Sequence, residues 1–290
     1  MGADGLRVAI ATAAEAQGLD DDEPLLVEAF ARHGVAAEPA VWDADVAWSR
    51  YDAVVVRSTW DYPARRAEFL AWAADVDGRL WNGPRVLAWN TDKVYLRELA
   101  AAGVPVVPTT WIEPDATGVT LPADGDYVVK PSVSAGSKDT VRYRAGEDVD
   151  AVEHVRLIQK SGRVTMVQPY VASVDSYGET ALLYVEGSFS HAIRKGPLLT
   201  AGQGFVDGLF AAEEITARRP SPAEREVADR VVTAARQIVG DLLYARVDLV
   251  AGDDGQPLLL ELELAEPSMF FGYDDGAADR LAAAVLARLG

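Results

Sequence analysis

Two short acidic segments near the C-terminus, Arg246-Val-Asp248 and Glu261-Leu-Glu263, alternate charged with apolar residues. Alternate residues of a strand share one face, so each segment would place its two charged side chains together. The turn sequence Gly-Asp-Asp-Gly at 252–255 predicts that the two strands are antiparallel neighbours, which brings the three carboxylates close. Such carboxylates repel one another unless a cation lies between them, and Mg²⁺ held by carboxylates commonly also binds phosphate. A solvated polar face on an edge hairpin explains the same alternation.

Lysine is rare in this chain, with five residues among 27 basic ones. Lys130 ends the apolar stretch Tyr-Val-Val-Lys and precedes a loop of small residues at 132–138, where backbone N–H groups could approach a phosphate. An ordinary hairpin turn is the alternative interpretation. Lys93 follows Asn-Thr-Asp at the start of an expected helix, where a solvated lysine is equally common.

The order of these features along the chain is more specific than any one of them. The order is Lys93, then Lys130 with its loop, then Gln168-Pro-Tyr170-Val171 at a strand end, then Asp248, Glu261 and Glu263. In this order the sequence resembles the ATP-grasp superfamily, of which glutathione synthetase and D-alanine–D-alanine ligase are members. The resemblance covers about residues 85–275.

The resemblance implies a nucleotide site for ATP. Lys93 and Lys130 match the two lysines that contact the α- and β-phosphates. The flexible loop that folds over the γ-phosphate is matched by Ser134, Ala135, Gly136 and Ser137. The hinge that pairs with the adenine edge through backbone groups is matched by Gln168, Tyr170 and Val171.

The same resemblance implies a metal site and groups near the transferred phosphoryl. Two Mg²⁺ ions, with Mn²⁺ as a possible substitute, would be held by Asp248, Glu261 and Glu263. The superfamily more often has Asn where this chain has Glu263, so the added charge changes the expected metal arrangement. Residues that could touch the transferring phosphoryl or the acyl phosphate are Arg246, Arg194 and Lys195. For Arg194 and Lys195, neutralisation of the acidic surface is the alternative.

Two further stretches are candidates for binding the second substrate. Arg57-Ser58-Thr59-Trp-Asp61-Tyr follows a buried strand at its carboxyl end, where ligands bind in open α/β sheets. Arg57 could hold a carboxylate bidentately, and Ser58, Thr59 and Asp61 could contact polar groups. A helix start in which Trp60 and Tyr62 pack is the alternative interpretation.

Ser268 lies in the second of these stretches, which follows the acidic Glu261-Leu-Glu263 segment and should border the reacting centre. Together the two stretches resemble the O-ureido-D-serine cyclo-ligase branch of the superfamily, which closes the D-cycloserine ring.

These residues must be positioned by helices and strands, and the expected order of those elements predicts an α/β protein, with α+β character in the ATP-binding part. Strands at 7–11 and 53–56 and helices at 23–33 and 63–76 alternate, which favours an open parallel sheet. We expect an N-terminal subdomain over 1–88, a central lid subdomain over 89–172 and a C-terminal subdomain over 173–290 with the metal-binding hairpin.

Later elements are predicted by their end signals. A helix over 91–102 would end at Gly103, and a strand over 106–111 would follow it. Ser221-Pro-Ala-Glu224 has the pattern of a capping box, which predicts a helix from there to Gly240.

Composition narrows the classes of function. The 290 residues contain 45 acidic and 27 basic side chains, a formal net charge of −18, and no cysteine. Such a surface repels nucleic acid and anionic lipid, and the lack of cysteine excludes thiolate metal sites. No apolar run is long enough for a membrane span and no secretory signal is evident, so we expect a cytoplasmic protein. We expect a monomer or homodimer that acts on a small, amino-acid-like molecule.

The resemblance implies an ATP- and Mg²⁺-dependent carboxylate–amine ligase that acts through an acyl phosphate and releases ADP and phosphate. In the cyclo-ligase interpretation the nitrogen belongs to the same amino-acid derivative, and the reaction closes a ring. An intermolecular amino-acid or peptide ligase is the alternative, and a non-catalytic nucleotide-binding module is a third hypothesis.

Overall fold

The computed structural model describes residues 5–76, 78–136, 138–197, 199 and 214–290, and they form three sheets with flanking helices. The N-terminal sheet has the order β2-β1-β3-β4, the central sheet β5-β8-β6-β7, and the C-terminal sheet β11-β10-β9-β12-β13. The strands are β1 (Arg7–Thr12), β2 (Ala36–Val41), β3 (Ala53–Ser58), β4 (Leu80–Trp81), β5 (Thr110–Ile112), β6 (Tyr127–Pro131), β7 (Val141–Tyr143), β8 (Thr165–Pro169), β9 (Glu179–Val185), β10 (Ser188–Lys195), β11 (Ile215–Ala217), β12 (Tyr244–Ala251) and β13 (Pro257–Glu263).

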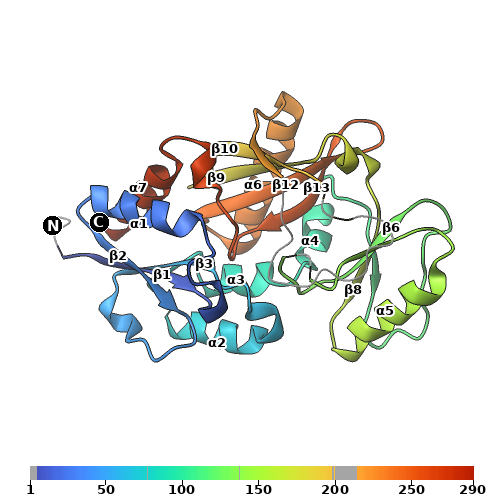
Figure 1. The fold of residues 1–290 in the computed structure, drawn as a ribbon, viewed down its shortest axis with the longest axis horizontal. Coiled ribbons are helices and arrows are strands. Elements are labelled where there is room, and N and C mark those ends of the chain that lie inside the picture. Colours follow the sequence, from blue (N-terminus) through green and yellow to red (C-terminus); the bar gives the residue numbers. More distant parts are fainter. Residues whose placement is uncertain (1–4, 77, 137, 198, 200–213) are drawn as a thin grey trace.

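The α-helices are α1 (Asp22–Arg32), α2 (Arg66–Asp75), α3 (Pro84–Asn90), α4 (Tyr95–Ala101), α5 (Asp148–Lys160), α6 (Pro222–Val239) and α7 (Ala277–Leu289). Short 3₁₀ turns lie at Ala14–Ala16, Trp48–Arg50, Tyr62–Ala64, Ala172–Asp175 and Phe271–Tyr273. The N-terminal sheet and the central sheet lie at opposite ends of the molecule, with the C-terminal sheet and α6 between them (Figure 1). The C-terminal helix α7 lies beside the N-terminal sheet and packs against α1 there (Figure 1).

The N-terminal sheet is parallel, as its β-α alternation predicts. All six residues of β3 are buried, because helices cover both faces of the sheet. The other two sheets are antiparallel in every strand pair that the structure describes. The fold therefore combines one parallel α/β layer with two antiparallel α+β layers, as expected from the sequence.

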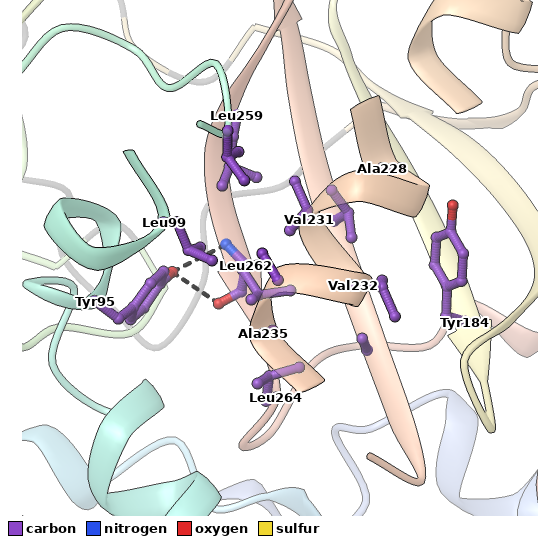
Figure 2. Close-up of a cluster of buried hydrophobic side chains, with 14 of the residues drawn as sticks. Tyr95, Leu99, Tyr184, Ala228, Val231, Val232, Ala235, Leu259, Leu262 and Leu264 are labelled. Atoms are coloured by element: carbon purple, nitrogen blue, oxygen red, sulfur yellow. Dashed lines mark hydrogen bonds between the residues drawn. The ribbon is translucent and has the colours of Figure 1, made fainter. Parts of the chain in front are cut away.

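The main core lies between α6 and the inner face of the C-terminal sheet, where apolar side chains such as Val231, Leu259 and Leu262 are buried (Figure 2). α6 begins with the predicted capping box: Ser221 Oγ accepts a hydrogen bond from Glu224 N, and Glu224 Oε2 accepts one from Ser221 N. The apolar stripe of α6 then packs on the alternating apolar positions of β12 and β13.

Side chains from α3 and α4 cover the outer edge of β13, an edge strand. The hydroxyl of Tyr95 donates to Leu262 O at 2.7 Å and accepts from Leu262 N at 2.9 Å (Figure 2). The amide of Asn90 donates to Leu262 O at 2.8 Å and accepts from Leu264 N at 2.6 Å. These contacts satisfy backbone groups that an edge strand otherwise leaves open, and they hold Glu261 and Glu263 in place.

Some predicted boundaries differ from the structure. The helix expected over 91–102 begins only at Tyr95, as α4; residues 91–94, which include Lys93, form a break between α4 and the preceding α3. The strand expected over 106–111 is confined to β5, because Pro105 and Pro108 keep the preceding segment out of regular pairing. Among the described residues, no helix has the length and apolar character to cross a bilayer.

Candidate active site

A cavity of about 730 Å³ is lined by the central sheet, the C-terminal sheet and the segments that follow β1 and β3; its volume is within the roughly 300–1,000 Å³ typical of small-molecule sites. It is lined from the N-terminal part by Trp60 and Tyr62, from the central sheet by Lys130, and from the C-terminal hairpin by Glu261 and Glu263. All three parts of the chain therefore contribute walls to one site.

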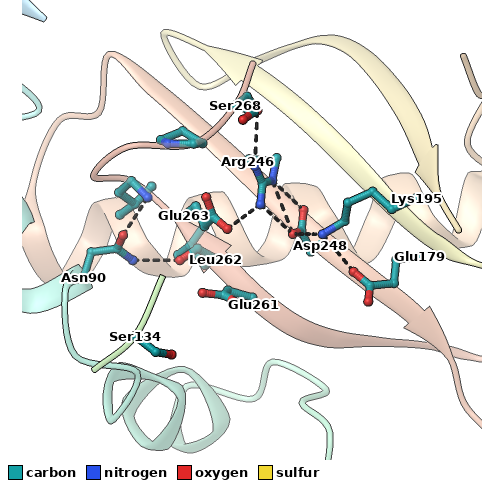
Figure 3. Close-up of polar contacts among 12 residues, drawn as sticks. Asn90, Ser134, Glu179, Lys195, Arg246, Asp248, Glu261, Leu262, Glu263 and Ser268 are labelled. Carbon is teal, nitrogen blue, oxygen red and sulfur yellow. Dashed lines mark hydrogen bonds and ion pairs between the residues drawn. The ribbon is translucent and has the colours of Figure 1, made fainter. Parts of the chain in front are cut away.

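The hairpin of β12 and β13 forms in the predicted antiparallel register. Arg246 pairs with Glu263 and Asp248 with Glu261, so the charged side chains lie directly opposite one another. Arg246 contacts both carboxylates: its Nε donates to Asp248 Oδ1 at 2.9 Å and its Nη2 to Glu263 Oε1 (Figure 3). The positive charge of Arg246 therefore offsets part of the repulsion between these carboxylates.

Lys195 extends this network from β10, which is separated from β12 by β9. Its Nζ lies 2.7 Å from Asp248 Oδ2 and 2.8 Å from Glu179 Oε2 (Figure 3). Burial would raise the pKa of Asp248, but Arg246 and Lys195 outweigh it and hold that pKa below its ordinary value. Asp248 is 1% exposed, so its charge depends on these two cations.

A second ion pair joins the two halves of the cavity. Lys93 Nζ lies 3.1 Å from Glu261 Oε1 and donates to Ser134 O at 2.9 Å. Burial would raise the pKa of Glu261, but Lys93 and Lys130 hold it below its usual range. Lys93 thus links the break between α3 and α4, the small-residue loop and β13.

Lys130 is buried at 8% exposure and forms no ion pair with a described residue. Burial lowers its pKa to about 8, because the charged ammonium loses solvation. Burial likewise raises the pKa of Glu263 to about 7 and that of Glu266 to about 8. The negative charge of the nearby Glu263 is the second cause that raises the pKa of Glu266. Buried groups with perturbed pKa values in one cavity are typical of a functional site.

The carboxylate oxygens fit a hard cation such as Mg²⁺, which takes oxygen ligands. Glu261 and Glu263 line the cavity, whereas Asp248 lies behind them against Arg246 and Lys195. As the described side chains stand, no three acidic or histidine groups converge on one point that could hold a metal. A metal held by Glu261 and Glu263 therefore requires Lys93 and Arg246 to give up contacts that they now make.

The predicted nucleotide residues line the same cavity. Ser134, Ala135 and Gly136 of the small-residue loop and Gln168, Tyr170 and Val171 of the hinge all do so; Ser137 lies outside the described residues. The side chain of Gln168 donates to Thr109 Oγ1 at 2.9 Å, and Arg142 stacks on Tyr170 with its Cζ 3.4 Å from the ring centre. Because the side chains of Gln168 and Tyr170 already have these partners, a ligand at the hinge would be contacted by backbone groups.

Contrary to the prediction, Arg57, Ser58, Thr59 and Asp61 do not line the cavity. β3 extends to Ser58, so Arg57, Ser58 and Thr59 are 0% exposed. Ser58 Oγ is bonded to Thr12 Oγ1 at 2.7 Å, and Asp61 Oδ1 accepts from Trp42 Nε1 at 2.9 Å. Trp60 and Tyr62, which follow the end of β3, line the cavity instead.

Arg57 is engaged in holding the segment that contains Ser268. Its Nη1 donates to Pro267 O, and its Nη2 lies 3.1 Å from Asp22 Oδ2. Asp22 also accepts the successive N–H groups of residues 269, 270 and 271, at 2.6, 2.9 and 2.7 Å. Arg57 and Asp22 therefore hold the segment through which Ser268 lines the cavity. Asp22 lines the cavity as well, whereas Arg57 does not.

Arg194, which was also predicted near the reacting groups, does not line the cavity. It neighbours Lys195 on β10, and successive strand residues point to opposite faces. Lys195 lines the cavity, whereas Arg194 donates to Tyr177 O at 2.9 Å on the other side. Arg246, Lys195 and Ser268 remain as predicted contacts for the reacting groups.

Several cavity residues were not predicted from the sequence. Tyr62 entered only as a packing residue in the alternative interpretation, and Glu179, Glu266 and Asp20 are not among the predicted site residues. The acidic run Asp20-Asp21-Asp22-Glu23 was a visible signal, but acids at the start of a helix are common for reasons of capping and dipole.

We expect Arg57→Ala to lower the free energy of unfolding by about 3–5 kcal/mol, because it leaves the buried Asp22 carboxylate without its cation. Urea unfolding followed by circular dichroism measures this change. Arg156→Ala, at an exposed arginine of α5, should leave the midpoint unchanged. An Arg57→Ala protein as stable as the parent would show that the Asp22 contact contributes little.

Comparison with known proteins agrees with this geometry. Residues 8–82 match the family described as "D-cycloserine synthetase DcsG, N-terminal domain". The "Cycloserine biosynthesis protein DcsG" of Streptomyces lavendulae is 38% identical over 299 residues, which cover 97% of this chain and 98% of that protein.

Two solved structures extend the comparison. The crystal structure of D-cycloserine synthetase DcsG has a TM-score of 0.90 at 37% identity and covers 98% of this chain and 100% of that one. The ATP-grasp ligase PsnB complexed with a minimal precursor, Mg and ADP has a TM-score of 0.62 at 21% identity, covering 97% and 98%. The latter likeness concerns the fold.

Proposed function

This chain belongs to the D-cycloserine synthetase family of ATP-grasp ligases, and on that premise we propose that it closes O-ureido-D-serine to a cyclic amide at the expense of ATP. The observation that carries the proposal is the convergence of Lys93, Lys130, Arg246 and the acids of β13 on one cavity, in a chain 38% identical to a cycloserine biosynthesis protein over its length. We also propose that the chain divides into subdomains at 1–88, 89–172 and 173–290.

The nucleotide would lie between the central and C-terminal sheets. Lys93 and Lys130 supply positive charge for the α- and β-phosphates, and the loop at 134–136 offers backbone N–H groups for the γ-phosphate. The hinge at 168–171 would receive the adenine through backbone groups, since the side chains of Gln168 and Tyr170 already have partners. Positioning and charge compensation supply most of the catalysis of phosphoryl transfer.

Glu261 and Glu263 would hold Mg²⁺, with Asp248 as a third candidate ligand. Bound Mg²⁺ supplies charge compensation on the β- and γ-phosphate oxygens. The γ-phosphoryl passes to the substrate carboxylate and gives an acyl phosphate. Arg246 and Lys195 lie beside these acids and would offset negative charge as the ureido nitrogen attacks the acyl carbon and phosphate leaves.

The walls of the cavity serve the intramolecular step. Trp60, Tyr62 and Ser268 would enclose the substrate at the end opposite the adenine, and a closed cavity keeps water from the acyl phosphate. Holding nitrogen and acyl carbon of one molecule together gives ring closure an advantage over attack by a second amine.

A panel of amino acids, each with and without a second amine, tests this proposal by ADP release. We expect O-ureido-D-serine alone to stimulate ADP release and to yield one cyclic product by mass spectrometry. ADP release that requires an added amine would favour the intermolecular amino-acid or peptide ligase instead. ATP binding without any substrate-stimulated ADP release would favour a nucleotide-binding module.

A further inference from the structure

Asp20 has a carboxylate oxygen that no described residue satisfies. Its side chain is 3% exposed, yet it lines the cavity. Oδ1 accepts from Asp22 N at 3.1 Å, which fixes the orientation of the carboxylate. Oδ2 is buried without a hydrogen bond, and Arg57 Nη2 lies 3.7 Å away, beyond hydrogen-bond distance.

The charges around Asp20 do not balance. Asp20, Asp22 and Glu23 surround a single guanidinium, that of Arg57, which is already bonded to Asp22 and to Pro267 O. Glu23 Oε2 is buried without a hydrogen bond as well. Burial raises the pKa of both Asp20 and Glu23, with Arg57 opposing it, which shows that one cation does not compensate the group.

Buried negative charge of this kind is stabilised by a cation that carries several N–H donors. Asp20 lines the cavity, and so do the uncharged Trp60, Tyr62 and Phe270. Among the described residues, Arg57 is the only cation within ion-pair distance of Asp20, so a ligand in the cavity would supply the further cation. Lys93, Lys130 and Arg246 line the same cavity and suit phosphate and carboxylate.

We propose that Asp20 binds the α-ammonium group of the amino-acid substrate and so determines that a free amine is required next to the reacting carboxylate. This inference rests on the proposed function and deepens it. Arg57 and Asp22 act as positioning residues: Asp22 N fixes Oδ1, and Arg57 Nη2, 3.7 Å from Oδ2, leaves that oxygen open to an ammonium N–H.

The test compares O-ureido-D-serine with 3-(ureidooxy)propanoate, the same molecule with hydrogen in place of the ammonium. We expect the parent protein to favour the amino acid by at least about 30-fold in kcat/KM, measured by ADP release, because an unpaired buried charge costs about 2 kcal/mol or more. In Asp20→Asn this preference should fall below about 3-fold, while the KM for ATP stays unchanged. Glu28→Gln, at an exposed acid of α1, the helix that follows Asp20, should keep the full preference.

An Asp20→Asn protein that keeps the full preference would overturn the assignment, and so would a parent protein without any preference, a result that needs no variant to fold. If the parent does not turn over O-ureido-D-serine, the proposed function fails, and the Asp20 assignment is judged by the same ratio on the amino acid that does release ADP. A protein in which no amino acid stimulates ADP release would overturn both.

Discussion

Glu261→Gln is expected to lower kcat by about 10³-fold while the protein stays folded. The substitution keeps the shape of the side chain but removes the charge that pairs with Lys93 at 3.1 Å and that would hold Mg²⁺. Both changes act on the phosphoryl transfer step, where the loss of one positioned charge costs roughly 10²–10³-fold. The measurement is ADP release at saturating ATP and Mg²⁺, with circular dichroism as the check of folding.

Glu153→Gln provides the matched control for this change, because Glu153 is an exposed residue of α5 outside the cavity. It should turn over like the parent protein. A Glu261→Gln protein with a near-parental rate would remove β13 from the metal and phosphate site. Since Tyr95 and Asn90 hold the backbone of β13 through Leu262 and Leu264, the substitution should leave the strand in register.

The part of the site that lies within one hairpin could be predicted from the sequence. Alternation and a short turn determine which faces of β12 and β13 the residues Arg246, Asp248, Glu261 and Glu263 occupy, and the observed register is the expected one. These are local rules, and they hold because the apolar partners must face α6.

The contacts that depend on burial could not be predicted in this way. An arginine at the end of a strand, such as Arg57, gives the same sequence pattern whether its side chain contacts a ligand or a buried acid. Asp22 lies beside Arg57 because of the way α1 packs, which the local sequence does not specify. The choice between Arg194 and Lys195 is different. Strand alternation allows only one of two neighbours to face the cavity, so this local rule argues against the shared role predicted for both residues.

Lys130→Met is expected to weaken ATP binding by about 10–100-fold without loss of stability. The methionine keeps the length of the side chain but removes the positive charge predicted to meet the phosphates, and a hydrogen bond to a charged group contributes about 1.5–3 kcal/mol. ATP binding is measured by isothermal titration calorimetry, with Lys160→Met at the exposed end of α5 as the control that should bind normally.

Stability and binding should respond to Lys130→Met in opposite ways, which separates a functional lysine from a structural one. Lys130 is buried without an ion pair to a described residue, and its pKa of about 8 shows that the fold disfavours its charge. Replacing such a charge by an apolar group of similar volume is neutral or stabilising. We therefore expect an unchanged or higher midpoint of urea unfolding together with weaker ATP binding. A less stable protein that binds ATP normally would instead mean that Lys130 supports the central sheet and not the nucleotide.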